Sequence, residues 1–580
     1  MKNLLALSFI IFTLIGYAQT NIISTNSTAE QVMLGNYIPS NYAATVVIDD
    51  HDAIIQGINA EVNSDSLKSL IMQLATFQNR NTGADTTSLI TGIGAARKWA
   101  YSKFEEISAD NENRLITSYL QFEQEICGMG QHRNVFSVLP GTDVADNKVI
   151  IIEGHMDSRC EDRCDSLCVA EGADDNASGT ALVIELARVM SKYTFKNTLV
   201  FMTTIGEEQG LLGANAFSQY AVDNGIQIEA VLNNDVVGGI ICGKTSSAPS
   251  CPGEGHIDST QVRLFSATGN GAASKSKQLA RYVKLEYKEE LLPVVSVPML
   301  LTIMTAEDRT GRGGDHIPFR EDGFAAIRFC SANEHGDAGS TAPGYTDRQH
   351  TSNDVLGIDT DSNSVIDSFF VDFNYLARNA VINGNAAAMA AIGPATPTAA
   401  VQVLDGPAFE VTISSAVSYP AYRIAVRSTS NDWDSVYTTT TLKDTVSATV
   451  TANVYRISVA SVDTLGIESL FSDEIMVFPT GITEMDREVS LPFELLQNNP
   501  NPYDEVTMIG VKTNYPSNYQ QAMIVIRDLQ GRLVKEIPIS LNGEYNEVPF
   551  EHGYGQAGIY IYSLVVDGEL LSTKQMVYAN

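Results

Sequence analysis

Four short apolar runs constrain the fold of this chain more than any other feature of its sequence. They cover residues 149–153, 198–205, 228–236 and 324–329, and residues 134–139 form a further strand-like stretch. The run at 149–153 is apolar at four consecutive positions, which is typical of a strand buried on both faces. Residues 177–193 and 211–222, between these runs, are predicted helices. Strands that alternate with helices predict an α/β domain with a mostly parallel sheet flanked by helices.

The predicted α/β domain covers residues 64–392. It begins with helical apolar spacing at 64–74, continues with a second amphipathic helix at 93–107, and ends after an alanine-rich helix. Residues 19–63 have no clear apolar period. The sequence leaves open whether they are an N-terminal extension or propeptide, or an extra pair of strands.

Two β-rich modules are expected after the α/β domain. Residues 393–398 are a linker by composition, and residues 399–478 alternate in polarity at 422–426 and 454–459. This segment resembles a fibronectin type III sandwich. All-β sandwich structure is also expected for residues 491–580.

The last module has a more specific resemblance. The segments at 496–503, 524–532 and 558–564, with a tail that contains Lys574, are together similar to the C-terminal sorting domain of Bacteroidota type-nine secretion cargo. The resemblance implies a partner in the outer-membrane secretion machinery and, usually, later removal of the domain. The alternative is a further adhesive β-sandwich.

The N-terminus is predicted to be a secretory signal peptide over residues 1–18. Lys2 is followed by a short apolar run to Ile15 and by small residues before Gln19. A retained membrane anchor is disfavoured because the run is too short to span a bilayer comfortably. We therefore expect a secreted or cell-surface protein that crosses the outer membrane and has no stable membrane span.

The net charge and the residues that follow one motif argue against two kinds of ligand, nucleic acids and nucleotides. A formal net charge of −32 argues against nucleic-acid binding, because a phosphate backbone needs a basic face. Residues 238–245 match the phosphate-loop pattern, but residues 246–252 contain two prolines and cannot begin the helix that this mechanism needs. We expect no nucleotide here, and a disulfide between Cys242 and Cys251 instead.

The chain has seven cysteines, which in an exported protein predict disulfides and at least one free thiol. Cys330 ends a strand-like run and is expected to be buried and inert. Cys160, Cys164 and Cys168 are spaced so that they could bind a metal, but export favours a disulfide-stapled loop beside the active-site cleft. Their pairing is left open.

Acidic and histidine residues follow the predicted strands at their carboxyl ends, where open α/β sheets bind their ligands. His155 and the pair Glu207 and Glu208 follow two strands, Asp235 ends a third, and Asp175 opens a helix. Carboxylates and imidazole together suit Zn²⁺ or a related divalent ion.

The number of these side chains fits two ions if one carboxylate of the Asp174–Asp175 pair bridges them. One ion would take His155 and Asp235, and the other Glu208 and His350, each with an open position for water. Glu207 then has no ligand role and is the candidate general base. Asp157 is placed to accept the second N–H of the His155 imidazole. Spacing alone does not decide which of the two aspartates bridges.

Five motifs occur in one order: Gly-His-x-Asp-Ser, Gly-Ala-Asp-Asp-Asn-Ala-Ser-Gly, Glu-Glu-x-Gly-Leu, an aspartate after a strand, and His-Thr-x-x-Asp. Together they resemble the M28 metallopeptidases, the co-catalytic zinc aminopeptidase group. The resemblance implies two zinc ions, a peptide substrate, and Glu207 as the base. It also implies Asp175 as the bridge, with the remaining ligands His155, Glu208, Asp235 and His350.

The expected function is a secreted zinc exopeptidase, specifically an aminopeptidase. Arg312, in a segment that corresponds to the family's substrate-side Asp-His-x-x-Phe motif with His316, could instead bind a substrate carboxylate and favour a carboxypeptidase. Tyr345 is a candidate to stabilise the oxyanion. A glutaminyl cyclase and a non-catalytic binding protein are weaker alternatives, because the ligand set for two ions and Glu207 are both intact.

Overall fold

The computed structural model divides the chain into two compact units, Met1–Phe478 and Pro479–Asn580. In the first unit it describes residues 19–242, 255–267, 274–308, 313–333, 348–404, 407–428, 430–450, 452 and 454–478. In the second it describes residues 493–503, 506–513, 519, 521–528, 533–541, 545–551, 558–567 and 569–579. The predicted signal peptide, Cys251, Arg312 and Tyr345 lie outside the described residues.

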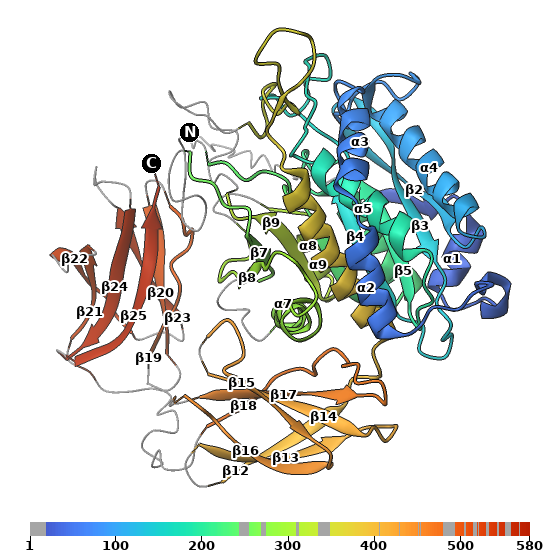
Figure 1. Cartoon of the computed structure of the whole chain (residues 1–580). Helices are drawn as coiled ribbons and strands as arrows, with labels where there is room; N and C mark the ends of the chain where they lie inside the picture. The colour runs from blue at the N-terminus through green and yellow to red at the C-terminus, as the bar shows by residue number, and fades with distance from the viewer. Residues whose placement is uncertain are drawn as a thin grey trace, which may run out of the picture. The chain divides into compact units, whose positions relative to one another are not determined.

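The first unit is built on a nine-stranded sheet with the order β1-β2-β3-β5-β4-β6-β9-β7-β8 (Figure 1). Its centre consists of four parallel strands, in which β5, β4, β6 and β9 are neighbours. Antiparallel pairs join β1, β2, β3 and β5 at one side and β9 to β7 at the other. The strands are β1 (Thr20–Ser24), β2 (Ile116–Ile126), β3 (Met129–Leu139), β4 (Val149–His155), β5 (Thr198–Thr204), β6 (Ile228–Asn234), β7 (Gln261–Phe265), β8 (Leu300–Ile303) and β9 (Ala326–Ser331).

Helices flank this sheet, which confirms the predicted α/β class. Helices α5 and α9 pack against β4, and α3 and α2 pack on them in turn, whereas α6 packs against α8, which contacts β6 and β9. The helices are α1 (Ser27–Met33), α2 (His51–Glu61), α3 (Ser64–Ala75), α4 (Gly92–Asp110), α5 (Ala177–Met190), α6 (Leu212–Asn224), α7 (Lys275–Glu286), α8 (His316–Glu321) and α9 (Phe373–Ile392). No helix in the described part of the chain is long and apolar enough to cross a membrane.

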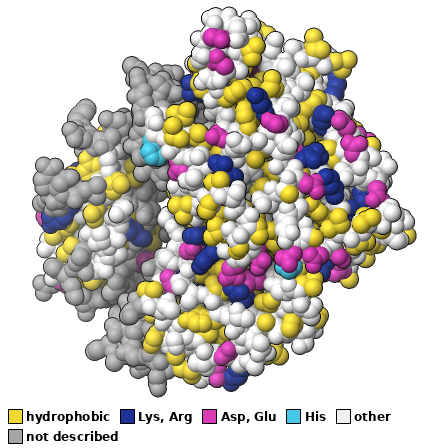
Figure 2. Space-filling model, viewed as in Figure 1, with side chains coloured by type: hydrophobic (Ala, Val, Ile, Leu, Met, Phe, Trp, Pro, Cys, Tyr) yellow, Lys and Arg dark blue, Asp and Glu magenta, His cyan; other side chains and the backbone are white. Residues whose placement is uncertain are grey.

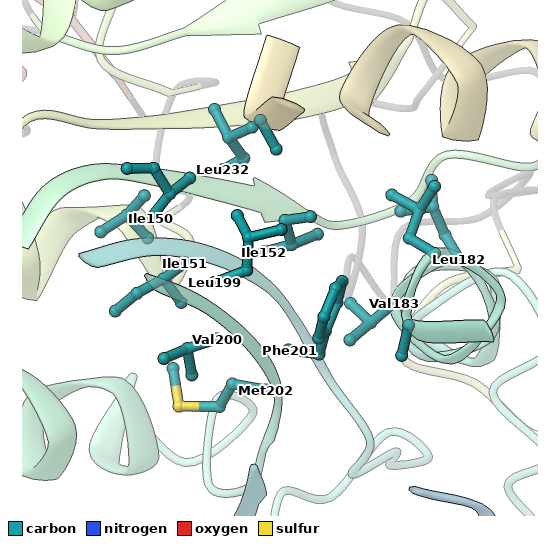
Figure 3. Close-up of a cluster of buried hydrophobic side chains, with 14 of the residues drawn as sticks. Ile150, Ile151, Ile152, Leu182, Val183, Leu199, Val200, Phe201, Met202 and Leu232 are labelled. Carbon is teal, nitrogen blue, oxygen red and sulfur yellow. The ribbon is translucent and has the colours of Figure 1, made fainter. Parts of the chain in front are cut away.

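The centre of the core lies between β4 and its neighbours. All seven residues of β4 and all seven of β5 are buried, as the continuous apolar pattern predicts. Figure 3 shows side chains of β4 packed with those of β5 and β6 and with α5; the labelled residues are Ile150, Ile151, Ile152, Leu182, Val183, Leu199, Val200, Phe201, Met202 and Leu232. This packing fixes the strand ends that carry the acidic and histidine residues.

Residues 19–63 contribute to this core. Strand β1 pairs antiparallel with β2 at the edge of the sheet. Val32 and Met33 of α1 and Ile54 and Ile58 of α2 are fully buried in the same hydrophobic cluster as the central strands. In this structure the segment is part of the α/β body.

A β-sandwich follows α9. A three-stranded sheet, β12-β13-β16, faces a four-stranded sheet, β15-β14-β17-β18. Ala425, Ala460 and Phe471 of this segment join the core of the α/β part, and Glu474 pairs with Arg427 and with Arg281 of α7. The strands are β12 (Thr398–Val403), β13 (Ala408–Ser414), β14 (Ala421–Arg427), β15 (Ser435–Thr439), β16 (Lys443–Ser447), β17 (Tyr455–Val462) and β18 (Ile475–Val477).

The second unit is a separate antiparallel sandwich with its own core. Its sheets have the orders β19-β20-β23 and β22-β21-β24-β25. Both modules after the α/β part are thus all-β, as predicted. The strands are β19 (Phe493–Leu495), β20 (Val506–Thr513), β21 (Ala522–Asp528), β22 (Leu533–Pro538), β23 (Tyr545–Glu551), β24 (Gly558–Val566) and β25 (Glu569–Tyr578).

A group of glutamates lies where the first sandwich meets the α/β part (Figure 2). Burial raises the pKa of Glu468 to about 7. The positive charge of Arg423 opposes this rise, and the negative charges of Glu289 and Glu290 add to it. Arg423 pairs with Glu468 at 2.7 Å and with Glu289 at 2.8 Å. Burial also raises the pKa of Glu286 well above its usual range. Burial therefore favours the neutral form of Glu286 and Glu468 in the folded protein.

The stability of this contact should depend on pH. Because the pKa of Glu468 is raised in the folded state, Glu468 stabilises the fold most below pH 4.5, which is the ordinary pKa of a glutamate side chain. This contribution to stability is lost as the pH rises through about 7. In Glu468→Gln, the fall in melting temperature from pH 5 to pH 8 should be smaller than in the wild type by about 2–4 °C. Glu410→Gln, on the sandwich surface, is the matched control. Equal pH slopes for Glu468→Gln and the wild type would contradict this assignment.

Candidate metal centre

The predicted site residues stand at the carboxyl ends of the central strands. His155 is the last residue of β4, Asp235 follows the last residue of β6, and Glu207 and Glu208 follow the end of β5. Asp175 immediately precedes Asn176, the N-cap of α5, whose side chain accepts a hydrogen bond from the Gly179 amide at 2.9 Å. The parallel sheet thus brings segments that are distant in sequence to one edge.

Two glycines allow α5 to approach the sheet closely enough to place Asp175. A Cβ on Gly179 would lie 2.1 Å from the Asn234 carbonyl oxygen, and a Cβ on Gly154 would lie 2.8 Å from the Gly179 carbonyl carbon. These distances are too short for any side chain. The glycines of the two motifs therefore serve the contact between the helix and the strands.

The site residues form two groups of potential ligands. In the first, His155, Glu207 and Asp235 each offer an atom within 4.8 Å of the others, and in the second the same holds for Asp175, Glu208 and His350. In the first group, the Nε2 atom of His155 lies 3.5 Å from Asp235 Oδ1 and 4.0 Å from Glu207 Oε2. In the second, the Nε2 atom of His350 lies 3.1 Å from Glu208 Oε2.

Asp175 lies between the two groups and presents one oxygen to each. Its Oδ1 atom is 3.2 Å from His155 Nε2, and its Oδ2 atom is 3.1 Å from His350 Nε2. Burial alone would raise the pKa of Asp175, but the two imidazoles outweigh burial and keep this pKa well below its usual range. The Asp175 carboxylate is therefore ionised, as a bridging ligand must be.

The electrostatics of His155 and Glu207 reflect the same crowding of carboxylates. Burial lowers the pKa of His155, but Glu207 and the carboxylates of Asp157, Asp175 and Asp235 outweigh it, so the net pKa lies well above its usual range. Burial raises the pKa of Glu207, and Asp235 and Glu208 raise it further against the effect of His155. These five acidic side chains in one small space create a strong demand for positive charge.

The residues present fit divalent ions. Among the described residues, the buried atoms His155 Nε2 and Glu208 Oε1 have no hydrogen-bond partner. The Nδ1 atom of His155 faces the Asp157 carbonyl oxygen at 3.1 Å and its carboxylate at 3.4 Å, so Nε2 is the nitrogen available to an ion. Imidazole nitrogens with carboxylate oxygens are a donor set that suits zinc and its neighbours in the transition series.

Asp354 and Asp174 hold the bridging residue in place. The Asp354 carboxylate accepts hydrogen bonds from the amides of Asp174 and Asp175, at 3.0 and 2.9 Å. The Asp174 carboxylate accepts from the amides of Gly238 and Gly239. Asp174 thus shapes the turn and Asp175 faces the site, and the glycine-rich stretch that mimics a phosphate loop binds this aspartate.

Two arginines in the site were not foreseen from the sequence. Arg328 of β9 pairs with Asp235 Oδ2 at 3.2 Å and with the Asp308 carboxylate at 2.7 Å. Arg159 donates from Nε to Glu208 Oε2 at 2.8 Å and from Nη2 to His350 Nδ1 at 2.5 Å. Arg159 lies four residues after His155 in sequence, but nothing in the spacing indicates that its side chain reaches a histidine 191 positions away.

The described residues around the site line an open cavity of about 230 Å³. Glu207, Asp175 and His350 line it, with Arg159 and Arg163 from the cysteine-rich loop. His316, predicted to contact substrate, does not line this cavity: it is fully buried, and its Nε2 atom lies 3.1 Å from the Glu307 carbonyl oxygen. Arg312 and Tyr345 are outside the described residues, and the substrate roles of all three stay predictions.

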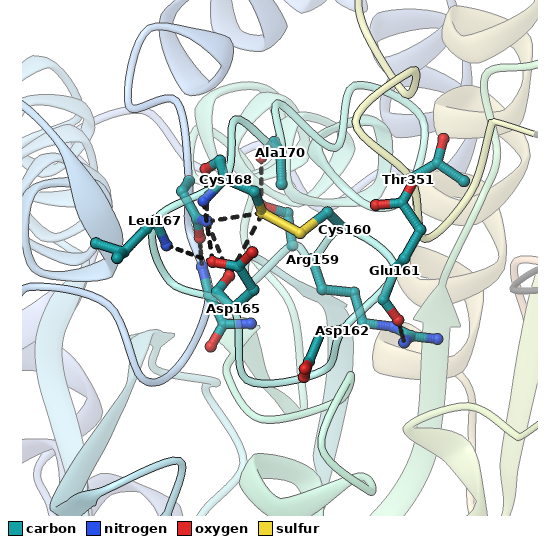
Figure 4. Close-up of a disulfide and its surroundings, with 12 residues drawn as sticks. Arg159, Cys160, Glu161, Asp162, Asp165, Leu167, Cys168, Ala170 and Thr351 are labelled. Atoms are coloured by element: carbon teal, nitrogen blue, oxygen red, sulfur yellow. Dashed lines mark hydrogen bonds between the residues drawn. A yellow bond between two sulfur atoms is a disulfide. The ribbon is translucent and has the colours of Figure 1, made fainter.

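The cysteine-rich loop is stapled by disulfides, as predicted. Cys160 pairs with Cys168, and Cys164 pairs with the more distant Cys127. Figure 4 shows the first disulfide beside the extended Arg159 side chain. Cys242 is also disulfide-bonded, although its predicted partner Cys251 is not among the described residues. Cys330 is buried and is not part of a disulfide.

Comparisons with known proteins identify the family of this chain. The model of peptidase family M28 matches residues 134–372. A probable zinc metalloprotease of Pyrenophora tritici-repentis is 31% identical over 305 residues, which cover 49% of this chain and 67% of that protein. A probable zinc metalloprotease of Leptosphaeria maculans is 29% identical over 401 residues, which cover 65% of this chain and 86% of that protein.

The chain belongs to peptidase family M28, and the predicted family resemblance is confirmed. Among solved structures, the LapA aminopeptidase of Legionella pneumophila is similar over 60% of this chain and 76% of its own, with 18% identity and a TM-score of 0.40. A likeness this distant carries no information on the reaction.

Asp354 offers a test of how the centre is positioned. In Asp354→Ala, the amides of Asp174 and Asp175 lose their acceptors, so the bridging carboxylate is no longer held in place. Affinity for a divalent ion should fall about 10–100-fold, measured by competition with a chelator of known affinity. Asp110→Ala, at an exposed position of α4, is the control. Unchanged affinity in Asp354→Ala would show that this contact does not position Asp175.

Proposed function

We propose that this chain is a secreted aminopeptidase that removes N-terminal residues from peptides with the help of two zinc ions. The observation that carries the proposal is the position of Asp175, which faces His155 with one carboxylate oxygen and His350 with the other. A single carboxylate shared in this way, with one further histidine and carboxylate on each side, is the donor set that two ions need.

Zinc is the ion that the relatives' names suggest and that the donors suit. Two zinc ions in these groups would supply Lewis acidity toward the scissile carbonyl and lower the pKa of water. His155 and Asp235 would hold one ion, and His350 and Glu208 the other, with Asp175 common to both. Arg328 pairs with Oδ2 of Asp235, so Oδ1, which lies 3.5 Å from His155 Nε2, would be the oxygen available to the first ion.

Glu207 is the proposed general base. Its carboxylate lines the cavity, and its Oε2 atom is farther from His155 Nε2 than the nearest oxygens of Asp175 and Asp235. It can therefore take a proton from water on one oxygen and return that proton to the leaving amine. Asp157 supports this arrangement, because it orients His155 and accepts a hydrogen bond from the Glu208 amide at 3.3 Å.

The charge of the side chains that line the cavity supports a preference for the amino end of a peptide. The lining carboxylates favour an α-ammonium group, whereas Arg159 and Arg328 are already paired with Glu208 and Asp235. These pairings make the two arginines poor sites for a substrate carboxylate.

Two features support the proposed secretion and domain organisation. The Tyr455 hydroxyl donates to the Val450 carbonyl at 2.7 Å and accepts from the Ala452 amide, a tyrosine-corner arrangement at the start of β17. With the sheets β12-β13-β16 and β15-β14-β17-β18, it supports a fibronectin type III module. The last unit folds as a sandwich of its own, as expected of a sorting domain that the secretion machinery would recognise.

Hydrolysis assays distinguish the alternatives. Amino-acid p-nitroanilides with a free amine and N-blocked dipeptides should be compared with and without a chelator. We expect chelator-sensitive release from the free-amine substrates only. Release from blocked dipeptides alone would indicate a carboxypeptidase, and the absence of any chelator-sensitive activity together with no bound zinc would overturn the enzyme assignment.

Removal of the proposed base should separate chemistry from ion binding. Glu207→Gln keeps the size of the side chain but cannot take up the proton, so kcat should fall by about 10²–10⁴-fold while the zinc content stays at the wild-type value. Glu125→Gln, at an exposed position of β2, is the matched control. Full activity in Glu207→Gln would exclude Glu207 as the base.

A further inference from the structure

A buried arginine contacts two of the segments that carry candidate ion ligands. Arg80 lies between α3 and α4, before residues 134–372 that the family model matches, and it is fully buried. Each hydrogen bond that its guanidinium group makes goes to a backbone carbonyl oxygen. A charged side chain is costly to bury, so the position of these carbonyl groups in the fold indicates what the arginine is for.

The guanidinium group of Arg80 joins the loop after β4 to the turn before α5. Its Nε atom donates to the Met156 carbonyl oxygen at 2.7 Å, and Met156 directly follows His155. Its Nη2 atom donates to the Gly172 carbonyl oxygen at 3.0 Å, in the turn that leads to Asp175. Because a guanidinium group is planar and rigid, the two hydrogen bonds fix the separation of the His155 and Asp175 segments.

Further contacts hold Arg80 itself in place. Its Nη1 atom donates to the Leu74 carbonyl oxygen at 3.3 Å, in the last turn of α3, and also to the Glu171 carbonyl oxygen. The Arg80 amide donates to Ser158 Oγ at 3.1 Å, and the Ser158 hydroxyl donates to the Ala170 carbonyl oxygen at 2.7 Å. The arginine is therefore anchored to a helix and does not merely follow the two loops.

The turn before α5 is shaped around the guanidinium group. Gly172 has a φ of +51°, in the left-handed region that favours glycine. A Cβ at this position would lie 2.5 Å from Ser158 Cβ and 3.1 Å from Arg80 Nη2. No side chain fits between the two segments at this point, so their separation depends on the contacts of Arg80.

Arg80 also brings positive charge to the buried side of the metal centre. Burial lowers its pKa to about 10, against the effect of the negative charges of Asp354, Asp157, Glu171 and Asp175. The guanidinium group therefore stays charged near neutral pH. Its charge partly offsets the repulsion among these carboxylates when no ion is bound.

A second buried arginine has the same type of contacts in another part of the α/β body. Arg114 donates to the carbonyl oxygens of Tyr42, Ser191 and Tyr193, at 3.1, 2.9 and 2.9 Å. It is only 4% exposed. None of its three partners is next to a candidate ligand in the sequence, so Arg114 shows what a purely structural arginine of this kind contributes.

We propose that Arg80 is a positioning residue of the metal centre, which sets the separation of His155 and Asp175 and thereby the affinity for zinc and the rate of hydrolysis. The inference rests on the proposed two-ion function. Arg80 contacts neither of the two groups of ligands directly and acts through the backbone of the segments that carry them.

Arg80→Lys in the full-length protein tests this role. Lysine keeps the positive charge, but its single ammonium group cannot hold both segments in the geometry of the planar guanidinium group. Affinity for zinc, measured by competition with a chelator of known affinity, should fall about 10–100-fold. At saturating zinc, kcat for an amino-acid p-nitroanilide should fall about tenfold while KM changes less than about twofold, because the residues that line the cavity are unchanged.

Arg114→Lys is the matched control. Both variants should lower the melting temperature of the ion-free protein, measured with excess chelator so that bound zinc does not contribute. Only Arg80→Lys should lower the zinc affinity and kcat. If Arg80→Lys does not fold, Ser158→Ala removes the acceptor of the Arg80 amide, and the zinc affinity should fall about 2–10-fold, the effect of one hydrogen bond.

The outcomes separate this inference from the function on which it rests. Wild-type zinc affinity and kcat in folded Arg80→Lys, or in Ser158→Ala if that variant takes its place, would overturn the positioning role and leave the two-ion function intact. An equal loss of zinc affinity in Arg114→Lys would also overturn it, because the effect would then be general destabilisation. Absence of zinc binding in the wild type would overturn both.

Discussion

The crowding of negative charge at one edge of the sheet is the constraint on which the rest of this structure depends. Four carboxylates lie around a cavity of about 230 Å³, and burial removes the water that would screen them. Such a group is costly to assemble unless positive charge comes with it. The carboxylates belong to Asp175, Glu207, Glu208 and Asp235.

The protein meets this demand in three ways that are coupled through the fold. Two imidazoles lie against the shared carboxylate of Asp175, two arginines pair with the outer carboxylates, and two divalent ions complete the balance in the proposed function. The rigid parallel strands provide the positions, and the glycines of the helix–strand contact let α5 bring Asp175 to the centre. The disulfide-bonded loop brings Arg159 to the same place from a segment with no regular structure.

Much of the fold and of the candidate site could be predicted because both depend on patterns within short segments of the sequence. The continuous apolar strands, the helix that opens after Asp175 and the positions of His155, Glu208 and Asp235 after strand ends are all properties of short segments. The α/β body and the gathering of the five candidate ligands therefore followed from sequence. Strand β7 and the edge strand β8 were missed because they are short and β7 has Arg263 at its centre. Helix α2 was missed because its three buried isoleucines stand among polar residues.

What could not be predicted depends on contacts between distant segments. The partners of Arg159 and Arg328 are set by the folded loop and by sheet order, which no spacing in the sequence records. The burial of His316 against the Glu307 carbonyl oxygen is likewise set by the folded structure, and its predicted contact with substrate stays a prediction. The pairing of Cys164 with Cys127 likewise joins the loop to the turn between β2 and β3, 37 residues earlier.

The central claim is that Asp175 is shared between two ions. Anomalous diffraction at the zinc absorption edge, from crystals equilibrated with zinc, tests it most directly. Two peaks are expected, one beside His155 and Asp235 and the other beside His350 and Glu208, with an oxygen of Asp175 directed at each. A single peak at saturating zinc, or two peaks of which only one contacts Asp175, would contradict it.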